Sequence, residues 1–231
     1  MSEIVVYTAL FTDDITQVYG GLPEYDDNGV DYICFTNTPH LKSNTWDIRL
    51  IEVEESSRKS ARKCKMMPHK LLPEYSGWIW MDNSCIFKYN PKDLYDFYNS
   101  NSDIAVHEHC DRRNIIEEAN ILISRGIDDS ETIMNQLSSY ISEGYKDQGL
   151  FETGILFREN NSKVNKFNEM WWVEVSTKSV RDQLSFSYII WKCKDIKINA
   201  IKETFVAHRH VLGKQQSEHF YTIPRKSERL I

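Results

Sequence analysis

The sequence has no excess of basic residues and no long apolar run. It contains 28 Lys and Arg against 34 Asp and Glu among its 231 residues, a formal net charge of −6. Proteins that bind nucleic acid neutralise its phosphates with a basic surface, so we expect no nucleic-acid partner. No apolar run reaches the roughly 20 residues that cross a bilayer, so we expect no transmembrane segment and at most a peripheral membrane contact.

The sequence also lacks the features of a secretory signal and of a cysteine-based scaffold. Its first residues, MSEIVVYTALF, carry no basic stretch ahead of a short apolar run. The cysteines are odd in number, scattered and never spaced as CxxC: Cys34, Cys64, Cys85, Cys110 and Cys193. This pattern argues against a zinc finger and a dense disulfide framework. We therefore expect reduced thiols in a cytoplasmic protein, working in solution or at the inner face of the membrane.

The sequence does contain an alternation of strand and helix patterns. Runs rich in β-branched and aromatic residues predict strands at 4–11, 31–36, 46–51, 78–81, 104–106, 155–157 and 196–198. Amphipathic spacing predicts helices at 60–67, from 91 onward, in two segments within 114–145, at 164–176 and at 181–192. This alternation favours an α/β layered fold with a mostly parallel sheet. We expect one domain over residues 1–214 and a polar tail at 215–231.

One predicted strand ends on an acid. WIWMDNSCIF at 78–87 runs from four large apolar residues into Asp82, Asn83 and Ser84. In open α/β sheets ligands bind at the carboxyl ends of the strands, and a carboxylate there can bind a divalent cation that bridges phosphates. All three residue types also favour turns, so an ordinary strand-to-turn junction explains the segment equally well.

A row of basic residues lies in and just after the predicted helix at 60–67. Arg62, Lys65 and His69 in ARKCKMMPH are three and four residues apart, and they share one face if the helix continues past Pro68. Such a row can meet a diphosphate, with the guanidinium making two contacts at once. A solvated basic face is the competing interpretation, although the apolar residues around the row favour a functional one.

Two further acids are candidates for acid–base chemistry. Glu152 lies in GLFETG, which precedes a predicted strand and whose glycines let a ligand approach the backbone. Asp182 lies in SVRDQ, at the start of a predicted helix. Each has a simple alternative. Glu152 can be a plain loop acid, and Asp182 can complement the helix dipole and cap the free amides of the first turn.

Two histidine pairs support a competing hypothesis. His107 and His109 in HEHCDR, and His208 and His210 in AHRH, share a spacing of two. Together with Asp82 they would form a metal centre of the hydrolytic type. The spacing is not specific, and a surface loop accounts for the first pair equally well.

Taken in order, several segments resemble one family. The segments VVYTALF, YICFTN, WDIR, ARKCKMMPHKLLPEY, WIWMDNS, HEHCDRRNIIEEA, GLFETGILFR, WW and RDQLSFSYIIWK are similar to the glycosyltransferase-like domain DUF616. That family is related to nucleotide-sugar transferases of the GT-A type. The resemblance extends from about Val5 to Lys192. It implies a GT-A-like (Rossmann-like) α/β/α sandwich that binds a nucleoside-diphosphate sugar.

The resemblance implies a cation at the end of the strand at 78–81. Asp82-Asn83-Ser84 matches the Asp-x-Asp motif with which these enzymes hold Mn²⁺ or Mg²⁺ on the donor diphosphate, except that Ser84 replaces the second acid. One carboxylate and one hydroxyl bind such an ion weakly, so His208 would complete its ligands.

The resemblance implies roles for the other candidates as well. Positive charge for the leaving diphosphate would come from Arg62, Lys65 and His69. The sugar-binding edge would include Glu152, Thr153 and Gly154. The reacting centre would include Asp182 and Gln183, with Asp182 ahead of Glu152 as catalytic base.

The implied function is transfer of a sugar from a UDP- or GDP-sugar to a glycan or other hydroxyl acceptor, in the synthesis of surface polysaccharides or glycoconjugates. If the reaction inverts configuration, a carboxylate must take the acceptor's proton; if it retains configuration, Asp182 would be a positioning group. The alternatives are the metal-dependent hydrolase and a non-catalytic glycan-binding module, which the aromatic content of 12% would suit.

Overall fold

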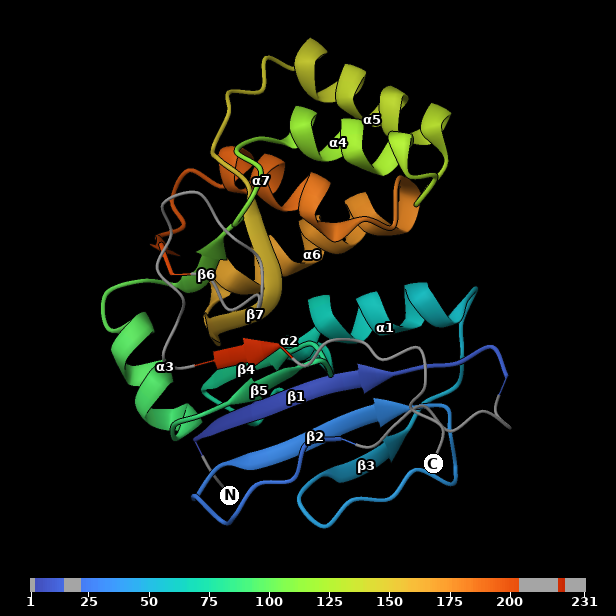
Figure 1. Cartoon of the computed structure of the whole chain (residues 1–231). Helices are drawn as coiled ribbons and strands as arrows, with labels where there is room; N and C mark the ends of the chain where they lie inside the picture. Colours follow the sequence, from blue (N-terminus) through green and yellow to red (C-terminus); the bar gives the residue numbers. More distant parts are fainter. Residues whose placement is uncertain (1–2, 15–21, 204–219, 223–231) are drawn as a thin grey trace.

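A seven-stranded sheet forms the centre of the computed structural model, which describes residues 3–14, 22–203 and 220–222 (Figure 1). The strands are β1 (Ile4–Leu10), β2 (Asp31–Thr36), β3 (Asp47–Leu50), β4 (Gly77–Met81), β6 (Ile104–Glu108), β7 (Phe151–Glu159) and β8 (Ile198–Ile201), in the spatial order β3-β2-β1-β4-β7-β6-β8. Only β7 runs antiparallel to its neighbours β4 and β6. The expected α/β fold with a mostly parallel sheet is confirmed.

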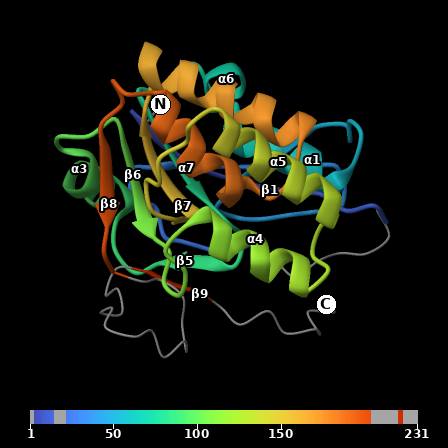
Figure 2. The same cartoon turned by 90° about the horizontal axis from the view of Figure 1, so that it is seen from above.

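Helices cover the sheet unequally on its two faces. They are α1 (Ser57–Met66), α2 (Pro68–Leu71), α3 (Pro91–Asn99), α4 (Ile115–Ser124), α5 (Ser130–Ser142), α6 (Ser162–Thr177) and α7 (Asp182–Lys192). α1, α6 and α7 lie together over one face, with α4 and α5 stacked outside α7 (Figures 1 and 2). On the other face α3 packs against β6, β7 and β8, beside a small sheet of β5 (Cys85–Phe87) and β9 (Phe220–Thr222).

Strand alternation divides the core into two. Val5 and Tyr7 of β1 are fully buried in the core beneath α1, α6 and α7, whereas Val6 is fully buried in the core beneath α3. The same alternation holds in β4, where Trp78 faces the first core and Ile79 the second. Successive side chains of a strand point to opposite faces, so these runs are apolar throughout because both faces are covered.

The sheet has two features that favour a ligand site at one edge. The chain leaves β1 for β2 on one side, while β4 pairs with β1 on the other, so the strand order reverses between β1 and β4. Ligands of open α/β sheets bind at such a switch point, beyond the carboxyl ends of the strands. β7 also carries a bulge there: Val106 pairs with Leu156, but the next residue, His107, pairs with Glu152. Bulges are frequent beside active sites.

Several local predictions were wrong. Residues 149–154 are not all loop, because β7 begins at Phe151 and contains both Glu152 and Gly154. The predicted helix at 60–67 does end before Pro68, which begins α2 because the first turn of a helix tolerates the missing N–H. The predictions missed β5 and β9. Most of the predicted tail at 215–231 lies outside the described residues, so the boundary at 214 stays a prediction, although Phe220–Thr222 form β9.

None of the described helices combines the length and the apolar character needed to cross a membrane.

Candidate active site

A buried ion pair joins two helices at the edge of the sheet. Lys65 is 1% exposed and Asp182 is 3% exposed, and Lys65 Nζ lies 2.6 Å from Asp182 Oδ2. The hydroxyl of Thr153 donates to the same oxygen at 2.9 Å and accepts from Lys65 Nζ at 3.0 Å. Three polar side chains from α1, β7 and α7 therefore satisfy one another in a place that excludes water.

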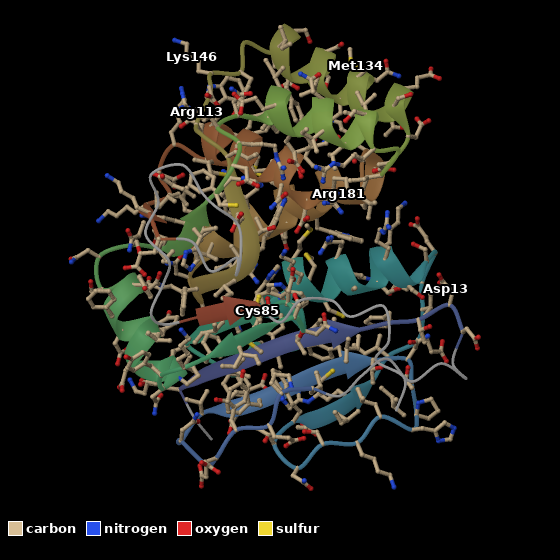
Figure 3. The ribbon with its side chains drawn as sticks, in the orientation of Figure 1. Asp13, Cys85, Arg113, Met134, Lys146 and Arg181 are labelled. Carbon is tan, nitrogen blue, oxygen red and sulfur yellow. The ribbon has the colours of Figure 1, made fainter. Side chains whose placement is uncertain are left out.

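Local structure explains why these side chains meet. Lys65 lies in the last turn of α1, which begins at the Ser56 N-cap and packs on β1. Asp182 is the first residue of α7, directly after Arg181, which is labelled in Figure 3. The predicted capping alternative for Asp182 does not describe its contacts, because its carboxylate bonds to Lys65 rather than to the helix end. As a first-turn acid it still complements the dipole of α7.

Two tryptophans enclose the ammonium group. The ring centroids of Trp80 and Trp171 lie 5.5 and 5.9 Å from Lys65 Nζ, within the range of cation–π attraction. The indole N–H of Trp171 donates to the main-chain carbonyl of Asp182 at 3.1 Å. These rings shield the ion pair from solvent, which strengthens its attraction.

The local charges hold Asp182 in its ionised form. Burial by itself would raise the pKa of this carboxyl, but the Arg62 and Lys65 cations outweigh burial and hold its pKa well below the usual range. Burial also lowers the pKa of Lys65, against the neighbouring Asp182 and Asp82 carboxylates that favour its charged form. A carboxylate that attracts protons so weakly is poorly suited to be a general base.

Arg62 is the part of this cluster that reaches toward solvent. Its side chain is 19% exposed, and Nη2 lies 3.4 Å from Asp182 Oδ1. Its buried Nε has no hydrogen-bond partner among the described residues. Because the side chain is partly exposed, its guanidinium can meet an incoming anion, and a guanidinium matches a phosphate with two parallel contacts.

Asp82 lies beside this cluster, directly after β4. Its side chain is 36% exposed, and Oδ1 accepts from the indole N–H of Trp80 at 2.8 Å while lying 4.0 Å from Lys65 Nζ. Its own main-chain N–H donates to the Gly154 carbonyl at 2.8 Å, within the bulged part of β7. Asp82 therefore shares one edge of the sheet with Lys65 and Gly154, as its position in the sequence predicts.

The residues at Asp82 suit a cation that binds together with a phosphate ligand. Mg²⁺ in proteins is commonly held by one or two carboxylates plus substrate phosphates. The described residues here supply one carboxylate, from Asp82, with Asn83 and Ser84 following it in a turn. His208, the predicted further ligand, lies outside the described residues.

The predicted basic row separates into two parts. Arg62 and Lys65 meet Asp182, whereas His69 lies in α2 and its Nε2 is 3.4 Å from Glu169 Oε1. His69 turns away because α2 begins at Pro68 and does not continue the face of α1. Gln183 follows Asp182 in α7 and is partly exposed.

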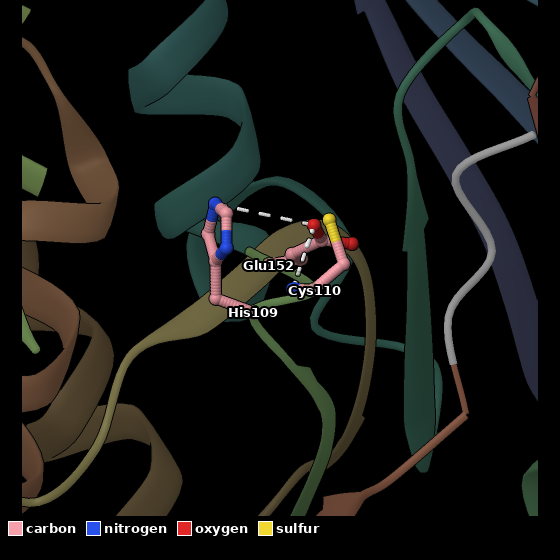
Figure 4. A group of neighbouring side chains, drawn as sticks. All are labelled: His109, Cys110 and Glu152. Atoms are coloured by element: carbon pink, nitrogen blue, oxygen red, sulfur yellow. Dashed lines mark hydrogen bonds and ion pairs between the residues drawn. The ribbon is translucent and has the colours of Figure 1, made fainter. Parts of the chain in front are cut away.

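Glu152 belongs to a second polar cluster, with His109 and Cys110 (Figure 4). The three side chains are buried, and their ligand atoms lie within 4.8 Å of one another. Glu152 Oε1 accepts from the main-chain N–H of Cys110 at 3.2 Å and lies 4.0 Å from His109 Nε2.

These three residues are of metal-ligating types, but Arg112 Nη2 lies 2.6 Å from the same ring nitrogen of His109. Burial and Glu152 also raise the pKa of Cys110 to about 12, so it is a thiol near neutral pH. The contacts of this cluster are therefore those of a hydrogen-bonded group that already faces a cation, the Arg112 guanidinium.

The predicted hydrolytic metal centre does not assemble from the described residues. His107 directs Nδ1 to the Glu203 carbonyl at 2.8 Å, and His109 faces Glu152 rather than Asp82. Within residues 3–14, 22–203 and 220–222, the group of His109 with Cys110 and Glu152 is the only one of three or more potential metal ligands. His208 and His210 fall outside those residues.

Sequence patterns did not single out three side chains that support the site. Trp80 and Trp171 have the spacing of ordinary core residues, and only their contacts distinguish them. Arg158, the second-last residue of β7, is fully buried. It donates to the Lys65 carbonyl at 2.6 Å, to Asn168 at 2.7 Å and to the Tyr7 hydroxyl, and so ties the end of α1 to the sheet.

The chain resembles a family model, a curated protein and a solved structure. The family model described as "TOD1/MUCI70, glycosyltransferase-like domain" matches residues 3–216. A probable hexosyltransferase, MUCI70 of Arabidopsis thaliana, is 24% identical over 143 residues, which cover 57% of this chain and 25% of that protein. The chain therefore matches about a quarter of that relative's length. A solved glycosyltransferase involved in glycosylation of the major capsid of PBCV-1 aligns over 97% of this chain and 94% of its own, with a TM-score of 0.49 and 8% identity.

The buried ion pair predicts how stability changes with pH. Replacing Asp182 with Asn leaves Lys65 without its carboxylate, and removing one partner of a buried pair typically costs about 3–5 kcal/mol. Because the folded-state pKa of Asp182 is lowered, its contribution is fully present above the unfolded-state pKa, about 3.9, and is lost as the pH falls. Denaturant unfolding should therefore show a large stability difference between wild type and Asp182→Asn at pH 7, which begins to narrow as the pH falls through about 4 and continues to narrow toward the lowered folded-state pKa.

Asp96→Asn is the matched control, because Asp96 forms an exposed pair with Lys92 one turn away in α3. Its effect on stability should be small at every pH. A difference between Asp182→Asn and wild type that stays constant down to pH 3 would contradict a buried ionised Asp182.

Proposed function

We propose a specific function from one premise: this chain belongs to the TOD1/MUCI70 glycosyltransferase-like domain family. The proposed reaction moves a hexosyl group from a UDP- or GDP-sugar to a hydroxyl of a glycan or glycoconjugate acceptor, in surface polysaccharide or glycoconjugate synthesis. The relative named as a probable hexosyltransferase supports the hexosyl part of the proposal. The donor, a GT-A-like way of binding it and the acceptor class are our inferences.

The observation that carries the proposal is the charge arrangement at the switch point of the sheet. Arg62 and Lys65 bring two cations to the edge where Asp82 ends β4. Departure of a nucleoside diphosphate develops negative charge on the leaving oxygens, and fixed cations in a low-dielectric site stabilise that charge. The sites of α/β sheets lie at this kind of edge, which supports docking of the donor pyrophosphate there.

We assign different tasks to the members of the cluster. Arg62, whose side chain is partly exposed, contacts the diphosphate directly. Lys65 is buried, so it acts mainly as a fixed positive charge beneath that contact. Asp182 holds both cations in place. Its lowered pKa makes it a positioning group and not the base, an assignment that suits a reaction with retention of configuration.

The sugar portion of the donor would lie beside the bulge of β7. Thr153 and Gly154 line this edge, and Gln183 follows Asp182 at the start of α7. Glu152 is buried against Cys110 and faces His109, so we do not assign it the role of base. His69 pairs with Glu169 and is left out of the donor site.

Mn²⁺ or Mg²⁺ would join this site through Asp82, with Ser84 close by and the donor phosphates as further ligands. When bound, such an ion neutralises charge on the diphosphate. Asp82 contributes an oriented carboxylate, because the Trp80 indole holds one of its oxygens.

Calorimetry with UDP and GDP tests the proposed function without knowledge of the acceptor. We expect one of the two nucleotides to bind, and Mn²⁺ to strengthen that binding because the phosphates complete its ligands. Screening nucleotide sugars for donor hydrolysis then identifies the sugar. If neither UDP nor GDP binds, with or without Mn²⁺, the proposed function is wrong.

Arg62→Gln tests the role of the guanidinium. A hydrogen bond to a charged group contributes about 1.5–3 kcal/mol, so nucleotide affinity should fall by about 10- to 100-fold. Arg58→Gln is the control, since Arg58 is an exposed residue of the same helix. Equal loss of affinity in both variants would point to general electrostatic attraction and would remove Arg62 from the site.

A further inference from the structure

Trp80 contacts both charged groups at the edge of the sheet. Its indole N–H donates to Asp82 Oδ1 at 2.8 Å, and the centroid of its ring lies 5.5 Å from Lys65 Nζ. The side chain is 3% exposed and packs edge-on against Tyr7, with centroids 5.2 Å apart. One rigid side chain thus contacts both the Asp82 carboxylate and the Lys65 ammonium of the candidate site.

The contact to Asp82 fixes the direction of its carboxylate. A tryptophan N–H is a donor only, so the indole can bind Asp82 but cannot compete for a cation or a proton. The bond holds Oδ1 against the buried wall, and within the described part of the chain no side chain donates to Oδ2. The Asp82 side chain is 36% exposed, and the bond from Trp80 leaves Oδ2 available to a ligand.

We propose that Trp80 is a positioning residue of the donor site, which orients the Asp82 carboxylate through its indole N–H while its ring holds the Lys65 ammonium in register. The inference rests on the proposed function, because it assigns Trp80 a part in binding the nucleoside diphosphate. Without the N–H, Asp82 would rotate among several orientations, and the ordering cost would be added to every binding event.

The chain provides a matched control two residues away. Trp78 lies in the same strand, faces the same core and is fully buried. Its indole N–H donates at 2.9 Å to the Leu72 carbonyl, a main-chain group, and not to a charged side chain. Trp78→Phe and Trp80→Phe therefore each remove one buried indole N–H from the same strand, and only the second touches the donor site.

The first measurement follows the indole N–H signals by NMR, with each signal assigned from its loss in the corresponding Phe variant. In Asp82→Ala the Trp80 indole signal should shift and its hydrogen exchange should accelerate, whereas the Trp78 signal should stay in place. This readout needs no nucleotide. An unchanged Trp80 signal in Asp82→Ala would overturn the contact on which the inference depends.

The second measurement compares nucleotide affinity with thermal stability. Both Phe variants should lose some stability, but only Trp80→Phe should weaken UDP or GDP binding, by about tenfold, and raise the Mn²⁺ concentration needed for full binding. In an Asp82→Ala background the same Trp80→Phe change should have a smaller effect on affinity, because only the ring contact to Lys65 is then altered.

The outcomes separate the inference from the proposed function. Equal affinity in Trp80→Phe and wild type, or equal losses in Trp80→Phe and Trp78→Phe, would overturn the positioning role while leaving the function intact. No nucleotide binding by the wild-type protein, together with a Trp80 signal that responds to Asp82→Ala, would overturn the proposed function and with it the role in binding, but not the contact.

Discussion

The buried pair of Lys65 and Asp182 is the interaction on which the rest of the site depends. It joins α1 to α7, and through Thr153 it joins both helices to β7. Burying two charges costs several kcal/mol for each ion, and their attraction compensates only when the geometry is good and the remaining hydrogen bonds are made. Thr153 and the two tryptophan rings meet those conditions here. Arg158 adds a second restraint by holding the Lys65 carbonyl. A buried ion pair often contributes no more stability than apolar residues of the same size. A fixed positive charge at a ligand site therefore explains this pair better than stability does.

The same contacts determine which chemistry this edge of the sheet suits. With Arg62 and Lys65 against it, Asp182 stays ionised and cannot easily accept a proton. The role of Asp182 is to hold the Arg62 and Lys65 cations at the switch point between β1 and β4, beside Asp82. This arrangement fits a reaction whose main requirement is stabilisation of a departing diphosphate. In the cluster of Glu152, His109 and Cys110, Arg112 supplies the positive charge.

The sequence predicted much of the fold because strands buried on both faces are apolar throughout. Ile4–Leu10 and Gly77–Met81 are examples, and the location of Asp82 at a strand end followed from the second of them. The ion pair that lies beside Asp82 could not be predicted from the sequence. Lys65 and Asp182 are 117 residues apart in the chain, and no local pattern reports such a contact. Helical spacing wrongly grouped His69 with Arg62, because Pro68 begins a separate helix. Gly154 was interpreted as part of a loop, whereas a bulged strand accommodates it. No sequence pattern distinguishes Trp80, because an aromatic residue in an apolar run is most often simply core.

The most direct test of the central claim is a crystal structure of the protein with a bound nucleoside-diphosphate sugar. The account predicts that the pyrophosphate lies at the edge formed by β4 and β7, with Arg62 in direct contact and Lys65 still paired with Asp182 behind it. It also predicts that Oδ2 of Asp82, the oxygen not bonded to Trp80, is directed to the phosphates or to a cation on them. A donor bound at any other place, with the side chains around Lys65 and Asp182 remote from its phosphates, would contradict it.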